Sequence, residues 1–264
     1  MHATWNALLR SASDRLRSIV IMNITSAATS LPFALALPPA HRASWPYLCC
    51  ALFLQVSYCF LLERAYRTGE LSRMYPIMRG IAPLLVSIGA AITIGEKMTT
   101  LSLAGVATVS CGIFVLAFEP AKRNIQSVLA AVGAGVFIAA FTLVDGLGAR
   151  LSMNAISYAL WLFILQGIAM SLCYITFRGH LSLKVMDYET AKAIVGGLLA
   201  LLAYGSIIVA LTLWPMGQVA ALRELSIVFA SAIGFVFLKE PLTLRRVGAA
   251  IIITAGAIVL ATGH

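Results

Sequence analysis

The chain has 264 residues, of which 61% are hydrophobic and 11% are charged, and its formal net charge is +9. A soluble domain has about 45–50% apolar and about 25% charged residues, so this composition excludes a soluble globular protein. The positive charges lie in short segments between long apolar runs, which argues against a nucleic-acid-binding protein. Apolar runs of about 20 residues recur along the chain and predict an all-α polytopic membrane protein.

In chain order, the apolar runs predict a short helical stub and nine full transmembrane helices. The stub covers residues 1–9 and would be about 14 Å long, too short for a hydrocarbon core of about 30 Å. Four of the breaks between helices contain proline, which favours turns and helix starts. The nine predicted helices cover residues 18–37, 46–62, 75–94, 101–118, 127–147, 155–177, 193–213, 217–238 and 247–261.

Two arginines stand at matching places in the two halves of the sequence. Arg79 and Arg223 each lie in an apolar run, and a glutamate follows each of them 17 residues later, at Glu96 and Glu240. The equal spacing predicts a duplication into repeats of residues 1–119 and 120–264. Five helices per repeat is an odd number, so the second repeat must insert upside down, and we predict two inverted five-helix repeats with a truncated first helix.

The two arginines are the strongest candidates for a substrate site. An arginine near mid-bilayer costs about 2.5–3.5 kcal/mol on insertion scales, so intramembrane charges usually serve a function. Arginine also binds carboxylate and phosphate groups bidentately. We therefore expect Arg79 and Arg223 to line a central cavity between the repeats. Neutralisation of Glu224 or of backbone carbonyls in a packed core stays open as the alternative. Glu224 itself is a candidate for a structural ion pair or for proton coupling.

Further candidate substrate-binding residues are aromatic or polar. Tyr58, Tyr75 and Trp5 can form aromatic walls, although aromatic residues also anchor helices at the membrane interface. Asp145, close to the end of its predicted helix, suits a cavity lining or a solvated helix end. Asn6 belongs to the stub.

Two structural expectations accompany these candidates. Glu96 and Glu240 are interpreted as helix-end residues that fix turns. Small residues four positions apart predict close-packing faces on two helices, formed by Ala104 and Thr108 on one and by Ala250 and Thr254 on the other.

The sequence offers no cofactor or metal site. The 5 cysteines lie in apolar runs without metal-binding spacing, and the 4 histidines are scattered. HExxH, GxSxG and Walker motifs are missing, which argues against an enzyme and against an ATP-driven pump. Three classes stay open: a secondary transporter, a non-transporting scaffold or assembly subunit, and, least favoured, a membrane-embedded enzyme.

Four segments resemble the EamA branch of the drug/metabolite transporter superfamily. They are similar to the end of the first helix and to the fourth, sixth and ninth helices of that family, and they read HATWNALLR at 2–10, YPIMRGIAP at 75–83, FTLVDGLG at 141–148 and PMGQVAALRELS at 215–226. The resemblance implies two inverted five-helix repeats, a central cavity and transport of small metabolites without ATP. The chain departs from the family at its start, where only about half of the first helix is present.

Together, these observations predict a multi-pass secondary transporter in the inner or plasma membrane. We expect it to export a small metabolite, such as an amino acid or another carboxylate-bearing compound, by alternating access around the central cavity. The expected partners are the substrate and the lipid bilayer, and a homodimer is also considered.

The distribution of Lys and Arg predicts the orientation. The stub is numbered as helix one, and each loop takes the number of the helix before it. The chain has 19 Lys and Arg residues, and only three of them lie in even-numbered loops: Arg42, Lys97 and Arg150. Apart from the intramembrane Arg79 and Arg223, all the others lie in odd-numbered loops. The positive-inside rule then places the odd loops in the cytoplasm and the C-terminus outside.

Overall fold

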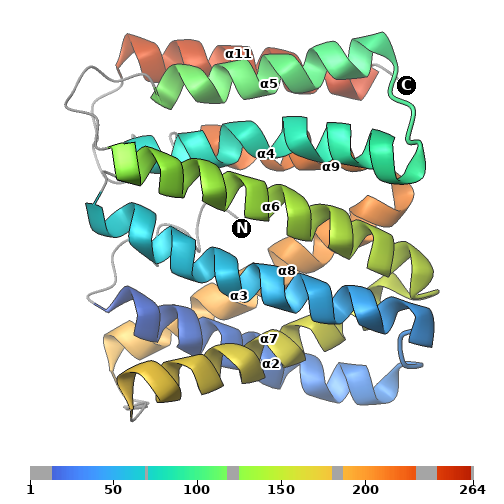
Figure 1. Cartoon of the computed structure of the whole chain (residues 1–264), viewed down its shortest axis with the longest axis vertical. Helices are drawn as coiled ribbons and strands as arrows, with labels where there is room; N and C mark the ends of the chain where they lie inside the picture. The colour runs from blue at the N-terminus through green and yellow to red at the C-terminus, as the bar shows by residue number, and fades with distance from the viewer. Residues whose placement is uncertain (1–13, 69–70, 118–124, 180–186, 230–242, 263–264) are drawn as a thin grey trace. The chain divides into compact units, whose positions relative to one another are not determined.

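The computed structural model describes residues 14–68, 71–117, 125–179, 187–229 and 243–262, and all its regular secondary structure there is helical (Figure 1). Seven of the described helical segments are long and apolar enough to cross a membrane. This confirms the predicted class, a polytopic α-helical membrane protein. The described helices are α2 (Arg15–Ala36), the short 3-10 helix η1 (Arg42–Ser44), α3 (Trp45–Thr68), α4 (Leu71–Ile94), α5 (Thr100–Ala117), α6 (Ile125–Leu151), α7 (Ala155–Arg178), α8 (Tyr188–Leu213), α9 (Met216–Arg223) and α11 (Leu244–Thr262).

The helix predicted over 101–118 is α5, whose bounds in the structure are Thr100–Ala117. One predicted helix differs from the structure. The predicted helix over 217–238 is interrupted, because α9 ends at Arg223. The stub lies outside the described residues, as do 230–242. The inverted arrangement of the repeats and the total number of helices stay predictions.

Contacts divide the chain into two compact units. Unit 1 contains the described residues of Met1–Val56 and Val144–Leu213, and unit 2 contains those of Ser57–Leu143 and Trp214–His264. Helices α3 and α6 have residues in both units. Each unit therefore combines segments from both predicted repeats, and the repeat boundary at residues 119 and 120 stays a prediction.

In unit 1, α2 packs against α7 and α8 (Figure 1). Glycines allow the backbones to approach closely at these contacts. A Cβ atom on Gly197 would lie 2.5 Å from the carbonyl oxygen of Met22, and one on Gly167 would lie 2.9 Å from that of Asn23. Ser26 Oγ also donates a hydrogen bond of 3.0 Å to the Gly197 carbonyl. Small residues of this kind are typical of helix contacts in membranes.

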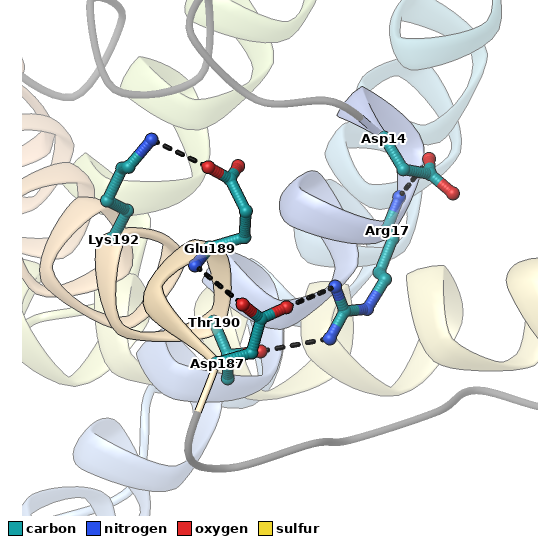
Figure 2. Close-up of polar contacts among 6 residues, drawn as sticks. All are labelled: Asp14, Arg17, Asp187, Glu189, Thr190 and Lys192. Carbon is teal, nitrogen blue, oxygen red and sulfur yellow. Dashed lines mark hydrogen bonds and ion pairs between the residues drawn. The ribbon is translucent and has the colours of Figure 1, made fainter.

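Polar side chains join the starts of α2 and α8 (Figure 2). Asp14 caps α2 by accepting a hydrogen bond of 3.0 Å from the amide of Arg17, which satisfies one of the free amides at the helix start. The guanidinium of Arg17 donates to Thr190 Oγ1 at 2.9 Å and lies 3.7 Å from the carboxylate of Asp187. These contacts lie at helix ends, where solvated charges are normally found.

In unit 2, α5 and α11 lie side by side (Figure 1). The closest approach is made by glycines. A Cβ atom on Gly256 would lie 2.8 Å from the amide nitrogen of Val109 and 3.0 Å from the carbonyl oxygen of Gly105. Neither backbone atom can move without disturbing its own helix, so this crossing requires glycine.

The close-packing faces predicted from Ala104 and Thr108 on α5 and from Ala250 and Thr254 on α11 were wrong. Ala104 and Thr254 are exposed. The hydroxyl groups of Thr108 and Thr254 donate to carbonyls of their own helices, those of Ala104 and Ala250, each at 2.7 Å. The spacing of small residues predicted a face of each helix next to the one that makes the contact. The contact is made by the faces that contain Gly105 on α5 and Gly256 on α11.

Candidate functional site

Arg79, Arg223 and Glu224 meet inside unit 2. Arg79 comes from α4, Arg223 is the last residue of α9, and Glu224 follows it. Arg79 Nη1 lies 3.1 Å from Glu224 Oε1, and Arg223 Nε lies 3.2 Å from the same oxygen. The two arginines are each 7% exposed and Glu224 is 0% exposed. We call these three residues the charged triad.

The charged triad is not neutral, because it holds two guanidinium groups and one carboxylate. Both arginines bind the same carboxylate oxygen. Among the described residues, Arg223 Nη2 and Glu224 Oε2 are buried without a hydrogen-bond partner. Leaving a buried polar atom unsatisfied costs about 1–3 kcal/mol, and more for a charged group. The triad therefore presents one unsatisfied donor and one unsatisfied acceptor.

The start of α9 is fixed by residues of α5 and of the segment before it. The helix begins after Pro215, and the amide of Met216 donates to Glu96 Oε2 at 2.8 Å. This contact agrees with the expected role of Glu96 as a helix-end residue; Glu240 lies outside the described residues. One turn further on, Gln218 Nε2 donates to Ser102 Oγ at 2.7 Å. These bonds set the position of α9 and hence of Arg223.

A break in the helix brings Glu224 onto its neighbour. The amide of Glu224 donates to the Ala221 carbonyl at 3.0 Å, and the amide of Ile227 donates to the Glu224 carbonyl at 2.9 Å. Both bonds span three residues, the tighter 3-10 spacing, before helical backbone resumes over 225–229. In a regular helix, adjacent side chains point about 100° apart. At this break, the side chains of Arg223 and Glu224 are in contact.

A second polar centre lies in unit 1, around Asp145 on α6. Its Oδ2 accepts hydrogen bonds from Gln55 Nε2 at 3.0 Å and from the Tyr204 hydroxyl at 2.5 Å. Its Oδ1 accepts one from the Tyr158 hydroxyl at 3.1 Å. Asp145 is 0% exposed, so the interpretation as a solvated helix end is wrong. We call these four residues the Asp145 cluster.

Two further residues of α6 bear on the Asp145 cluster. A Cβ atom on Gly148 would lie 2.6 Å from the Tyr158 hydroxyl oxygen, so the glycine leaves room for that ring. Arg150 points elsewhere and donates to the Leu211 carbonyl at 2.9 Å. Leu48 and Leu162, both fully buried, pack around Tyr158. The cluster is thus held in a packed apolar core.

Sequence reasoning missed Gln55, Tyr158 and Tyr204. Their signal is present in the sequence, because each is a polar side chain inside an apolar run, where such groups usually find a partner. Tyr58, a predicted site residue, lies edge-on to Phe141 in unit 2 with ring centroids 5.7 Å apart.

The remaining predicted site residues are Tyr75, Trp5 and Asn6. Tyr75 belongs to α4, but its side chain lies outside the described part of the structure, as do Trp5 and Asn6. Among the described residues, no group of His, Cys, Asp and Glu is arranged to hold a metal ion.

These features define a polytopic α-helical membrane protein with buried ionisable groups inside its helices. A sequence model of the EamA-like transporter family matches residues 125–262, which is more than half of the chain. The chain belongs to the EamA-like transporter family, and it is a membrane transporter of the drug/metabolite transporter type.

A protein of known crystal structure is similar in fold. It superimposes with a TM-score of 0.79 at 17% sequence identity, over 99% of this chain and 91% of the other. A search of curated proteins finds no significant match.

Proposed function

We propose that this protein is a secondary transporter that exports a small carboxylate-bearing metabolite, and that the charged triad receives the carboxylate. Amino acids are the favoured class. The single observation that carries the proposal is the pair of unsatisfied atoms at the triad, Arg223 Nη2 and Glu224 Oε2.

The charge of the triad supports an anionic ligand group. Two buried arginines share one carboxylate, which leaves a net charge of about +1. A buried charge is tolerated when it is paired and hydrogen-bonded. A ligand carboxylate bound to Arg223 would balance the excess charge, and guanidinium groups suit such a planar anion.

The unsatisfied acceptor supports a ligand that also carries a donor. Glu224 Oε2 can accept a hydrogen bond from an ammonium group, while Arg223 Nη2 donates to a carboxylate. A zwitterion such as an amino acid satisfies both atoms at once. A dicarboxylate would satisfy Arg223 but would place a second negative charge beside Glu224, which favours the amino acid.

The remaining predicted site residues enter the proposal as secondary contributors. Tyr58 and Tyr75 are proposed to form an aromatic wall of the site, and Trp5 and Asn6 are proposed as further lining. Transport is proposed to follow alternating access, as is common for secondary transporters built from repeats.

Ligand-induced thermal stabilisation of the purified protein tests the proposal. A ligand present at about 100 times its Kd adds about 2.7 kcal/mol to the stability of the folded state. L-amino acids are compared with dicarboxylates and with amino-acid amides, which lack the carboxylate. We expect stabilisation by one or more amino acids and none by the corresponding amides. Equal stabilisation by acid and amide would contradict a carboxylate site.

Substitution then locates the site. Arg223→Ala and Arg79→Ala are expected to weaken binding of the active amino acid about 10- to 100-fold, because a hydrogen bond to a charged group contributes about 1.5–3 kcal/mol. Counterflow in proteoliposomes should fall with binding. Arg150→Ala is the matched control, since it removes an arginine of unit 1 that bonds to the Leu211 carbonyl; binding should be retained. Unchanged binding and counterflow in both triad variants would end the proposal.

A further inference from the structure

Glu224 and Asp145 differ in the hydrogen-bonding capacity of their partners. A buried carboxyl group can gain and lose a proton only if its partners can hydrogen-bond to both forms. Both partners of Glu224 are guanidinium groups. These are donors only and stay charged in proteins. A proton on Glu224 would remove the negative charge that both arginines contact, and neither guanidinium could accept a hydrogen bond from the new acid.

Asp145 has neutral partners that work in both directions. A tyrosine hydroxyl donates and accepts, and an amide side chain has a donor end and an acceptor end. When Asp145 is ionised, Gln55, Tyr158 and Tyr204 donate to it. When it is protonated, one hydroxyl can turn and accept the acid O–H. The Asp145 cluster can therefore be hydrogen-bonded in both states, which a buried proton site requires.

The surroundings of Asp145 do not fix its charge. Among the described residues, none of its ion-pair or hydrogen-bond partners is cationic. On α6, Arg150 bonds to the Leu211 carbonyl. The described charged residues of α7 and α8 lie at the ends of those helices, at Arg178, Glu189 and Lys192.

Two members of the cluster lie on the two helices that contribute to both units. Gln55 and Asp145 each lie within two residues of the point at which their helix passes from one unit to the other, at Val56 in α3 and at Val144 in α6. A change in the hydrogen bonds of Asp145 thus occurs on the two helices that contribute to both units.

We propose that Asp145 is the reversible proton-binding site of this transporter and that Glu224 is not. The step is the formation of one O–H bond on the Asp145 carboxylate, with a proton that comes from water and returns to water. The role of this proton as the coupling ion rests on the proposed secondary transport, whereas its binding at Asp145 does not.

Infrared difference spectroscopy tests the proposal without any substrate. The aspartates of the chain are Asp14, Asp145 and Asp187, so the double variant Asp14→Asn/Asp187→Asn retains Asp145 alone. With ¹³C-carboxyl aspartate incorporated, acidification from about pH 9 to about pH 5, the range in which buried carboxyl groups titrate, should produce the C=O band of a protonated acid that shifts with the label. Realkalinisation should remove the band.

Three variants assign the band. Adding Asp145→Asn to the double variant should abolish the labelled band, and adding Glu224→Gln should leave it unchanged. Tyr204→Phe should shift its frequency, because one hydrogen-bond partner is lost, and it keeps the assignment possible if Asp145→Asn does not fold. No label-sensitive band in the double variant, or a band lost with Glu224→Gln, overturns the proposal. The ligand experiments on the triad are independent of this result, so either proposal can fail alone.

Discussion

At the scale of single residues, the contacts within the charged triad determine how much stability is lost when one of its members is removed. Arg79 and Arg223 both bind the carboxylate of Glu224. Loss of one arginine leaves Glu224 paired with the other, whereas loss of Glu224 removes a counter-charge from both arginines. Stability is therefore most sensitive at the glutamate.

We predict that Glu224→Gln lowers the free energy of unfolding by about 3–5 kcal/mol, the usual effect of leaving buried charges uncompensated. Arg79→Ala should cost much less, because Arg223 still pairs with Glu224. Denaturant or thermal unfolding of the purified variants in the same detergent measures the difference. A larger loss for Arg79→Ala than for Glu224→Gln would contradict this prediction.

The sequence pointed to these residues because a charge inside an apolar run is conspicuous. It could not supply the partners of Asp145. Gln55 lies 90 residues from Asp145 and Tyr204 lies 59 residues from it, and such pairs form only through the packing of distant helices. The position of Asp145 near the predicted end of its helix suggested exposure, but α6 continues to Leu151 and its surroundings cover the carboxylate.

At the scale of elements, the crossing of α5 and α11 depends on backbone contact, and α11 contains its own control. A Cβ atom at Gly256 would meet backbone atoms of α5, whereas one at Gly248 meets nothing within 4 Å. Both glycines lie in the same helix, and alanine favours helix over glycine by about 1 kcal/mol. Substitution at the two positions thus separates packing from helix propensity.

We predict that Gly256→Ala lowers stability by about 1–3 kcal/mol through overpacking, while Gly248→Ala is neutral or stabilising. Thermal unfolding of the two single variants in one detergent provides the comparison. Equal effects of the two substitutions would show that α5 and α11 can separate without cost.

Apolar runs predicted the helices well, and the described helices of unit 1 begin and end within a few residues of the expected positions. The break after α9 was not predictable from the run over 217–238, which is apolar on both sides of the pair Arg223 and Glu224. The break coincides with contacts of Glu224 to Arg79 on α4, and hydropathy along one segment contains no information about a partner on another.

At the scale of the whole molecule, the distribution of Lys and Arg predicts a C-terminus outside the cytoplasm. A reporter that is active only outside the cytoplasm, fused after His264, should be active. The same reporter inserted in the segment 180–186, within an odd-numbered loop, should be silent. The reverse pattern would overturn the assigned orientation.

Each unit contains residues from both the first and the second half of the sequence. This arrangement affects how the units form during biosynthesis. Arg79 and Glu224 are 145 residues apart, so at about 5–20 residues per second roughly 7–30 s separate the synthesis of the two. During that interval Arg79 is in the membrane or its insertion machinery without the carboxylate that later binds it. Unit 2 also lacks α11, the packing partner of α5, until residues 244–262 have been made. A chain that stops before residue 224 therefore holds Arg79 without the carboxylate that binds it in the structure.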